Sequence, residues 1–164
     1  MSEPMHKYKR ALFVGRFQPF HKGHLYVIQK ILPFVDELII GIGTLDKTKG
    51  ENLFTYEQRK EMIEKVLEQK RISKKITFVA LEDNPDDAVW LSKTLSKTGH
   101  IDVVIGNNEW TNSIFEKSGY KVWRIGFYFR NLYEGQKIRK LIKERKHWEK
   151  RVPAPVASLV KQYL

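Results

Sequence analysis

Residues 11–25 read ALFVGRFQPFHKGHL, and this stretch decides the fold of the chain. It opens with an apolar run of the kind that forms a buried strand. It ends at the beginning of a segment in which Leu25, Ile28 and Ile31 recur at helical spacing. Between the two, Gly15 lets the backbone come close to a ligand. The stretch therefore predicts a strand, a tight turn and the start of a helix.

The same alternation of short apolar runs and amphipathic segments continues along the chain. Further strands are predicted at residues 37–43, 76–81, 101–105 and 120–125, and helices at 24–34, 55–69, 87–97, 111–117, 135–145 and 154–163. The helix at 55–69 opens with a capping-box pattern from Thr55 and Gln58. Alternating strands and helices predict an α/β fold, a Rossmann-like doubly wound parallel five-stranded sheet with helices on both faces. In such sheets ligands bind beyond the carboxyl ends of the strands.

The length of 164 residues predicts a single domain over residues 1–164, with 1–9 flexible and 146–164 a C-terminal helical segment. The chain has no cysteine, which excludes disulfides, thiolate metal sites and cysteine nucleophiles. No apolar stretch approaches the roughly 18 residues of a membrane helix. The N-terminal residues lack the apolar core of a signal peptide. We therefore expect a cytoplasmic protein without a membrane partner.

The formal net charge of +11 predicts anionic partners, either nucleic acid or a phosphate-rich small substrate. Basic residues are dense at 137–151, but that run also contains the apolar residues Ile138, Leu141 and Ile142. It is therefore equally compatible with the solvated face of a helix. Because the chain contains no recognisable RNA- or DNA-binding motif, we do not expect nucleic acid as the partner.

Two histidines follow the first predicted strand. His21 and His24 are three residues apart, so that both rings can lie on one face at the start of a helix. Together with Arg16 and the free N–H groups of a helix N-terminus, they can form a phosphate cradle. The alternatives are a structural pair that caps or packs, or a metal pair, for which no third ligand is evident. The segment matches neither GxxxxGK[ST] nor GxGxxG.

The string GRFQPFHKGHL from Gly15 to Leu25 resembles the HxGH signature of the nucleotidylyltransferase superfamily, and in full it is similar to the archaeal type of nicotinamide mononucleotide adenylyltransferase. The strings VDELIIGIG, ENLFTYEQR, IGNNEW, KSGYKV and IRKLI follow in the order that this family shows. The resemblance implies a nucleotidyltransferase of NAD biosynthesis. The enzyme would transfer AMP from ATP to nicotinamide mononucleotide and give NAD and pyrophosphate.

The resemblance also implies roles for the first motif. His21 and His24 would contact phosphate oxygens, and His24 would stabilise the transition state. Arg16 would contact phosphate, while Gly15 and Phe17 would line the nucleotide site through their backbone. Mg²⁺ would accompany ATP and be held by phosphates and water, with no metal site made by the protein.

The second motif of the family, usually Ser-Gly-Thr-x-Ile-Arg, is here the string EGQKIR at residues 134–139. By resemblance, Arg139 holds the triphosphate at a helix N-terminus, and Gln136 can donate a hydrogen bond in place of the threonine. Glu134 replaces the serine, and its carboxylate would repel a triphosphate. We expect this side chain either to turn to solvent or to lie near magnesium.

Three further residues are assigned by resemblance to the nucleotide sites. Trp90 would stack on the nicotinamide ring, although a core tryptophan is the rival interpretation. Asp87 stands where the family usually has asparagine, which weakens the case for nicotinamide. Gly106 and Asn107 would lie close to the nucleotide, although Gly-Asn is also ordinary turn chemistry.

Several alternatives stay open at this point. The segment 43–54 can be a mobile loop over the site or a plain surface loop. Arg59 can be a charge on the helix surface or a ligand of the acceptor phosphate. The enzyme can use a different phosphate acceptor or CTP as donor, or the chain can bind a nucleotide without turnover. A homo-oligomer is possible, because members of the archaeal family are often multimeric.

Overall fold

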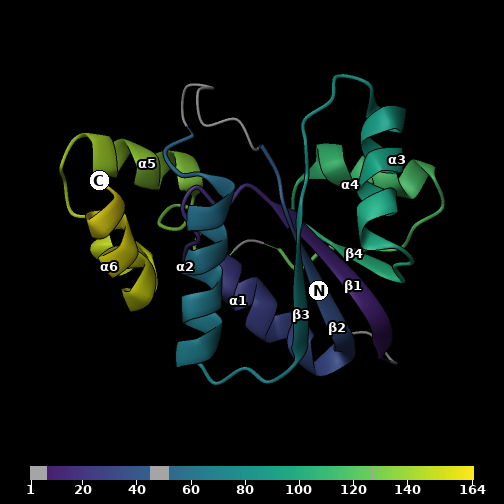
Figure 1. Cartoon of the computed structure of the whole chain (residues 1–164), viewed down its shortest axis with the longest axis horizontal. Helices are drawn as coiled ribbons and strands as arrows, with labels where there is room; N and C mark the ends of the chain where they lie inside the picture. The colour runs from purple at the N-terminus through teal and green to yellow at the C-terminus, as the bar shows by residue number, and fades with distance from the viewer. Residues whose placement is uncertain (1–6, 45–51, 127) are drawn as a thin grey trace. The chain divides into compact units, whose positions relative to one another are not determined.

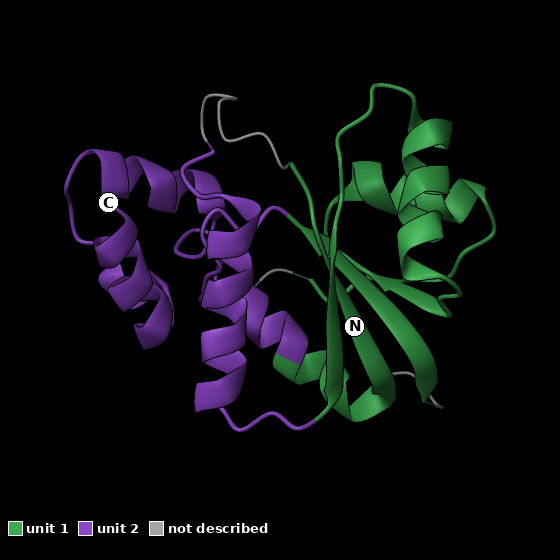
Figure 2. Cartoon of the chain, viewed as in Figure 1, with its two compact units in different colours: residues 1–15, 29–45, 74–126 green, residues 16–28, 46–73, 127–164 purple. Residues whose placement is uncertain are grey.

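The computed structural model describes residues 7–44, 52–126 and 128–164. They divide into two compact units, each assembled from three segments of the chain (Figure 2). Unit 1 comprises residues 1–15, 29–45 and 74–126, and unit 2 comprises 16–28, 46–73 and 127–164. Because the segments of the two units alternate along the chain, neither unit is a continuous piece of sequence. The single domain over residues 1–164 stays a prediction.

Unit 1 contains a five-stranded parallel sheet (Figure 1). Its strands are β1 (Tyr8–Gly15), β2 (Val35–Ile42), β3 (Lys75–Ala80), β4 (Val103–Ile105) and β5 (Val122–Trp123). Their order is β3-β2-β1-β4-β5, so the chain proceeds outward from β1 first in one direction and then in the other. This order confirms the predicted Rossmann-like, doubly wound α/β fold. The order reverses between β1 and β4, which is where sheets of this type bind ligands.

The central strands are apolar because both of their faces are buried. Ala11 of β1 lies opposite Leu38 of β2 on one side and Val103 of β4 on the other, and all three side chains are buried. Further along β1, Phe13 lies opposite Ile105, the last residue of β4. Gly15 and Asn107 are each two residues beyond this pair, so both belong to the carboxyl edge of the sheet.

Helices α3 (Asp87–Thr98) and α4 (Glu109–Lys117) complete the core of unit 1. The side chain of Asp86 caps α3 and that of Asn108 caps α4, each by accepting hydrogen bonds from backbone N–H groups of the first turn. Their apolar faces and the sheet share one cluster of buried residues, which comprises Leu12, Ile39, Leu81, Trp90, Leu91, Ile101, Val104, Ile114 and Phe115. This core fixes the turn between β4 and α4.

Unit 2 contains residues 22–28 of α1 (Lys22–Ile31), together with α2 (Tyr56–Gln69), α5 (Gly135–Lys143) and α6 (Ala154–Tyr163). Two short 3₁₀ helices are present in the chain, Leu32–Phe34 after α1 and Glu149–Arg151 before α6. The capping box predicted for α2 is confirmed, since Thr55 and Gln58 exchange both side chain–backbone hydrogen bonds. Helix α6 packs on α2, where the Tyr163 hydroxyl donates to Glu61 at 2.7 Å.

Some predicted boundaries are wrong. β1 begins at Tyr8, where pairing with Val35 extends the strand, so residues 8 and 9 are not part of a flexible terminus. β5 is limited to the two residues that pair with β4. Helix α5 ends at Lys143 because Arg145 has a φ of 55°, in the left-handed region. Residues 1–6 and 45–51, which include most of the predicted loop, lie outside the described residues.

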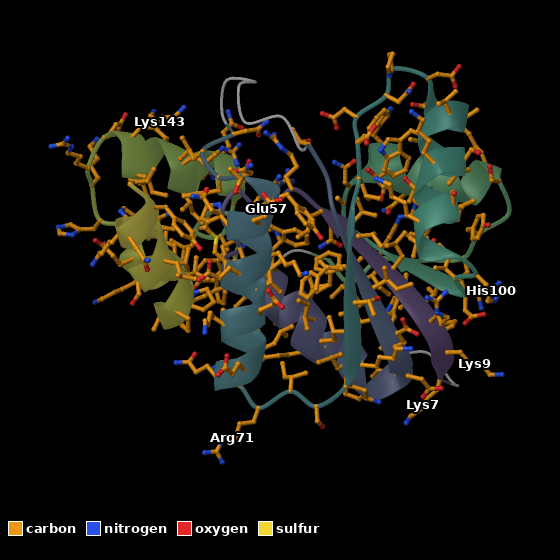
Figure 3. All side chains as sticks on the ribbon, viewed as in Figure 1. Lys7, Lys9, Glu57, Arg71, His100 and Lys143 are labelled. Atoms are coloured by element: carbon orange, nitrogen blue, oxygen red, sulfur yellow. The ribbon has the colours of Figure 1, made fainter. Side chains whose placement is uncertain are left out.

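Charged side chains project from the surface of both units, among them Lys7, Arg71 and Lys143 (Figure 3). Within the described ranges, none of the helices combines the length and the apolar character needed to cross a membrane.

Candidate functional site

The loop that joins β1 to α1 has an unusual backbone. Phe17 has a φ of 52°, and the peptide bond between Gln18 and Pro19 is cis. A positive φ is costly for a bulky residue and persists only where the surroundings enforce it. Here the Phe17 side chain is buried and its ring lies edge-on to the imidazole of His24, with the centroids 4.7 Å apart. Phe17 therefore positions His24 through its side chain, a contact that the sequence did not predict.

His21 and His24 lie against each other, with ring centroids 3.6 Å apart and planes 19° from parallel. Each Nδ1 atom accepts backbone hydrogen bonds. The backbone N–H of His21 donates to His24 Nδ1 at 3.1 Å, and that of Gly23 donates to His21 Nδ1 at 3.1 Å. A neutral imidazole whose Nδ1 accepts carries its proton on Nε2. Both rings therefore offer an Nε2–H group as a hydrogen-bond donor.

Burial keeps both rings neutral. It lowers the pKa of His21 to about 3, and the positive charge of Arg139 adds to this effect. Burial also lowers the pKa of His24 well below its ordinary value, with a further contribution from His21. At neutral pH the pair therefore consists of two uncharged donors rather than two cations.

Gly23, between the two histidines, is required by close packing. A Cβ atom on this residue would come within 2.9 Å of Cε1 and 3.0 Å of Nδ1 of His21. The glycine of the motif thus makes room for the ring that precedes it.

Gln18 connects three parts of unit 2. Its side-chain amide exchanges two hydrogen bonds with the backbone of Phe54, at 2.9 and 3.0 Å. Its carbonyl oxygen accepts a hydrogen bond from Nη1 of Arg139 at 3.0 Å. Sequence reasoning did not single out Gln18, because its partners lie 36 and 121 residues away. The sequence contained one indication of its role: Gln18 is a polar residue between the apolar residues Phe17 and Pro19.

Arg139 lies over the N-terminus of α5. Its side chain is buried, and its Nη1 atom comes within 2.8 Å of the position that a Cβ on Gly135 would occupy. Gly135 therefore permits the guanidinium to reach the loop that carries His21. The predicted phosphate ligands His21, His24 and Arg139 are thus brought together within unit 2.

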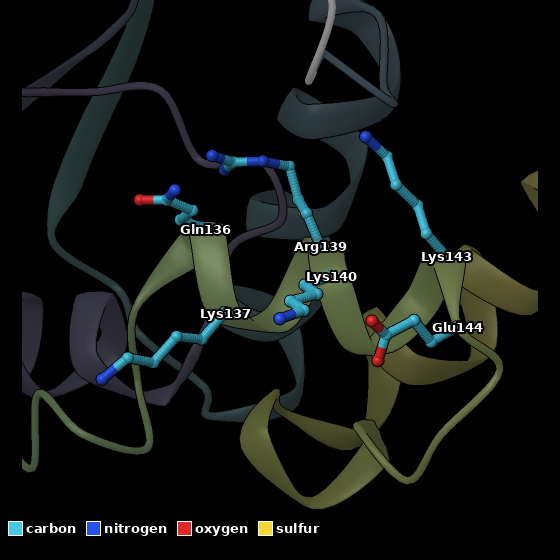
Figure 4. A pocket seen from close by; sticks show the side chains of 6 residues that line it. All are labelled: Gln136, Lys137, Arg139, Lys140, Lys143 and Glu144. Atoms are coloured by element: carbon cyan, nitrogen blue, oxygen red, sulfur yellow. The ribbon is translucent and has the colours of Figure 1, made fainter.

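Helix α5 and its C-cap residue Glu144 border a hollow whose lining is mostly basic. The hollow has a volume of about 370 Å³ and is lined by Gln136, Lys137, Arg139, Lys140, Lys143 and Glu144 (Figure 4). The carboxylate of Glu134, at the N-cap of α5, lies 3.6 Å from Nζ of Lys137. The Glu134 side chain is 31% exposed, so it lies partly toward solvent, as one of its two predicted positions requires; its position near magnesium stays a prediction.

Two arginines hold the rest of the loop in unit 2. Arg16 donates to Oδ1 of the buried Asn52 at 2.5 Å. Arg59 is fully buried and donates through Nη1 to the carbonyl oxygen of Arg16 at 2.7 Å. The interpretation of Arg59 as a surface charge is therefore wrong. Its position three and four residues before Met62 and Ile63 placed it on the apolar face of α2.

The turn after β4 belongs to unit 1. The side chain of Asn107 accepts from the backbone N–H of Gly126 and donates to the carbonyl oxygen of Gly126, both at 2.8 Å. Asn107 thereby ties the segment after β4 to the segment after β5. Asn112 of α4 is buried and donates to the Gly106 carbonyl oxygen at 3.2 Å. Its Oδ1 atom lies 2.7 Å from the position that a Cβ on Gly106 would occupy. Among the described residues this Oδ1 atom has no hydrogen-bond partner.

Gly15 and Trp90 complete the predicted residues of unit 1. The carbonyl oxygen of Gly15 accepts from the backbone N–H of Gly43 at 2.9 Å, which continues the pairing of β1 with β2. Trp90 is 8% exposed and packs edge-to-face on Phe115, with centroids 5.8 Å apart. The rival interpretation of Trp90 as a core residue therefore describes its packing. Asp87, one turn earlier, is exposed.

The described residues contain no group of three or more His, Asp or Glu side chains arranged to hold a metal ion. The donors gathered in unit 2 are imidazole, guanidinium and amide groups. These are hydrogen-bond donors suited to phosphate oxygens.

Comparisons with known proteins agree on one family. The cytidylyltransferase-like family model matches residues 12–160. A nicotinamide-nucleotide adenylyltransferase of Archaeoglobus fulgidus is 41% identical over 158 residues, which cover 93% of this chain and 91% of that protein. One of Methanosarcina mazei is 37% identical, over 94% of this chain and 88% of that protein.

Among solved structures, a bifunctional NMN adenylyltransferase/ADP ribose pyrophosphatase from Francisella tularensis has the same fold, with a TM-score of 0.82 and 23% identity. The match covers 94% of this chain and 49% of that one, so the present chain spans about half of its length. The same protein complexed with AMP and a manganese ion gives a TM-score of 0.70 at 22% identity, covering 88% of this chain and 44% of that one.

Proposed function

The chain belongs to the nicotinamide-nucleotide adenylyltransferase family known from archaea, and from this premise we propose that it makes NAD from nicotinamide mononucleotide and ATP. In this reaction a phosphate oxygen of nicotinamide mononucleotide attacks the α-phosphorus of ATP. The bond between that phosphorus and the oxygen bridging to the β-phosphate breaks, and pyrophosphate leaves. The protein forms no covalent intermediate, and its task is to align the two nucleotides and to stabilise charge.

The observation that carries the proposal is the histidine pair beside Arg139. His21 and His24 offer Nε2–H donors fixed by backbone hydrogen bonds. Rigid donors directed at oxygens on which charge develops stabilise a transition state without reorganising. His24, which is held by both His21 and Phe17, is the residue to which we assign this task.

The donor's phosphates would lie at the N-terminus of α5. Arg139 supplies a permanent positive charge, and Gln136 an exposed side-chain amide. Within the described chain, the N-cap residue of α5 makes no side-chain hydrogen bond to the first turn. The backbone N–H groups there are therefore available to phosphate oxygens. Arg16 would contact phosphate from the other end of the loop.

The family resemblance supports nucleotide-binding roles for four further residues, each considered within its own unit. We assign this role to Gly15, Phe17, Gly106 and Asn107. Because both polar atoms of the Asn107 side chain bind Gly126, Asn107 acts by shaping the turn rather than through its amide. Trp90 is assigned to the nicotinamide ring.

Mg²⁺ fits this site as a companion of ATP rather than as a protein-held ion. The donors around His21 and Arg139 are suited to phosphate, whereas magnesium prefers oxygen ligands such as carboxylates, phosphates and water. When bound with ATP, the ion would neutralise charge on the phosphates. The manganese ion with AMP in the Francisella structure supports a divalent cation at such sites.

The proposal is tested by incubating the protein with ATP, Mg²⁺ and nicotinamide mononucleotide and measuring both pyrophosphate and NAD, the latter with a coupled dehydrogenase. We expect the two products in equal amounts. Nicotinic acid mononucleotide, pantetheine phosphate and flavin mononucleotide are tested as acceptors, and CTP as donor. Exclusive use of CTP or of another acceptor would overturn the assignment. ATP binding without any product would identify a relative that has lost turnover.

Two further parts of the proposal concern the state of the protein. ATP as donor supports a cytoplasmic location, which cell fractionation tests. A homo-oligomer is proposed from the family resemblance, and light scattering coupled to size-exclusion chromatography measures its mass directly.

A further inference from the structure

Helix α5 begins differently from three other helices of the chain. Thr55, Asp86 and Asn108 each cap their helix through a side-chain hydrogen bond. Glu134 occupies the same position at α5, but its carboxylate lies beside Lys137 instead, one turn further along. The two side chains are partly exposed, at 31% for Glu134 and 51% for Lys137.

The ion pair matters because of what else Glu134 adjoins. The guanidinium of Arg139 lies against Gly135, the residue that directly follows Glu134. A carboxylate is attracted both to this guanidinium and to the positive end of a helix. A released Glu134 side chain would therefore compete for the groups to which the donor's phosphates would bind.

We propose that Lys137 is a positioning residue that holds the Glu134 carboxylate beside itself, so that this carboxylate does not compete with the phosphates of ATP at the N-terminus of α5 and at Arg139. The side chains of Lys137 and Arg139 leave the helix in different directions (Figure 4). The carboxylate of Glu134 lies 3.6 Å from Nζ of Lys137 and is therefore held on the Lys137 side of the helix. The inference rests on the proposed function, because it takes ATP as the ligand of this helix end.

The contribution of the pair is indirect. A partly exposed ion pair adds little to folding stability. A carboxylate next to a bound triphosphate, in contrast, repels several negative charges at short distance, although solvent and salt screen the repulsion. Loss of Lys137 is therefore expected to weaken ATP binding rather than to unfold the protein.

The test is a double-mutant cycle on the full chain, read out as the dissociation constant of ATP with Mg²⁺ in the absence of acceptor. We expect Lys137→Gln to weaken binding about three- to tenfold, on the order of screened charge repulsion. Lys137→Arg, which keeps the ion pair, should stay within about twofold. The Glu134→Ser/Lys137→Gln double variant should bind ATP as Glu134→Ser does, because no carboxylate then has to be held. Lys143→Gln is the matched control, since it removes one positive charge from the same helix without touching the pair.

An equal loss from Lys137→Gln with and without Glu134→Ser would mean that Lys137 acts on the phosphates directly, and it would overturn the proposal. The proposal would also be overturned if Lys137→Gln bound ATP with wild-type affinity, or if Lys143→Gln lost as much ATP affinity as Lys137→Gln. ATP binding is measured without acceptor, so the cycle can succeed even where no NAD forms and the proposed function fails. If the wild-type protein does not bind ATP, both proposals are wrong.

Discussion

The imidazole of His21 occupies the space that a side chain on Gly23 would need, with Cε1 at 2.9 Å and Nδ1 at 3.0 Å from the Cβ position. The Cβ of Tyr133, at 3.2 Å, closes the other side. A methyl group on Gly23 must therefore displace the ring, and the backbone hydrogen bonds to Nδ1 are lost with it.

We accordingly expect Gly23→Ala to lower kcat by about 10- to 100-fold, the cost of misplacing a catalytic group by roughly 1 Å. Steady-state NAD synthesis measures the effect. Gly43→Ala is the control, because a Cβ there meets nothing closer than the Gly15 carbonyl oxygen at 3.8 Å. Full activity of Gly23→Ala would mean that the position of His21 is unimportant.

The role of His24 as a donor can be separated from its role in the loop. In His24→Asn, the amide oxygen takes the place of Nδ1 and can still accept from the backbone N–H of His21, but the Nε2–H donor is gone. We expect kcat to fall by about 10²- to 10³-fold, the usual cost of one transition-state donor, with little change in thermal stability. His24→Ala, which removes both functions, should in addition unfold at a lower temperature. A His24→Asn enzyme with normal turnover would show that the ring is structural.

The buried, neutral state of His21 predicts a pH dependence of stability. The folded protein holds the pKa near 3, whereas the unfolded chain titrates at the ordinary value near 6.5. Below pH 6.5 the unfolded state therefore binds a proton that the folded state does not. The free energy of unfolding should fall as the pH drops from about 6.5 toward 3, by up to roughly 1.4 kcal/mol per pH unit for this residue.

Urea unfolding of the wild type and of His21→Asn, at pH 7 and pH 5, checks this contribution. The stability advantage of the wild type should shrink by at most about 2 kcal/mol over that interval. Parallel pH profiles for the two proteins would show that the pKa of His21 is the same in the folded and unfolded states, which would contradict its burial as a neutral ring.

Gly106 and Asn112 should behave as a coupled pair. The Oδ1 atom of Asn112 lies 2.7 Å from the Cβ position of Gly106, so Gly106→Ala overpacks a buried site. We expect a loss of about 1–3 kcal/mol in the free energy of unfolding. Adding Asn112→Ala should recover part of this loss, because the clashing amide is removed. Strict additivity of the two single changes in urea unfolding would contradict the close contact.

Trp90 has to satisfy both the core and the proposed stacking role. Trp90→Ala should destabilise the protein by about 3–5 kcal/mol, since it opens a cavity against Phe115. Trp90→Phe keeps an aromatic ring in the core and is the variant to use for kinetics. We expect it to raise KM for nicotinamide mononucleotide more than KM for ATP. Equal changes in both constants would restrict Trp90 to the core.

Features set by neighbouring residues were predictable from the sequence. The capping box of Thr55 and Gln58 depends on two side chains three residues apart, and the structure confirms it. The doubly wound sheet follows from the alternation of apolar runs and amphipathic segments, because parallel strands need crossover helices. The sequence also pointed to both histidines, since their spacing puts the two rings on one side of the loop.

Features that depend on distant contacts could not be read in this way. The hydrogen bond from Arg139 to the Gln18 carbonyl oxygen joins residues 121 positions apart, and no local sequence pattern predicts it. The two hydrogen bonds between the Asn107 side chain and the Gly126 backbone form only because β4 and β5 are neighbours in the sheet. The spacing of Arg59 relative to Met62 and Ile63 placed it on the buried face of α2. A charged residue is nevertheless usually exposed, so the sequence alone did not distinguish a buried arginine from a surface one.

The pair formed by Glu134 and Lys137 also constrains how this helix end can change over evolutionary time. On the proposed role of Lys137, a glutamate at residue 134 is expected to weaken ATP binding unless a basic residue stands at position 137. In a set of related sequences, an acidic residue at position 134 should therefore occur together with a basic residue at position 137.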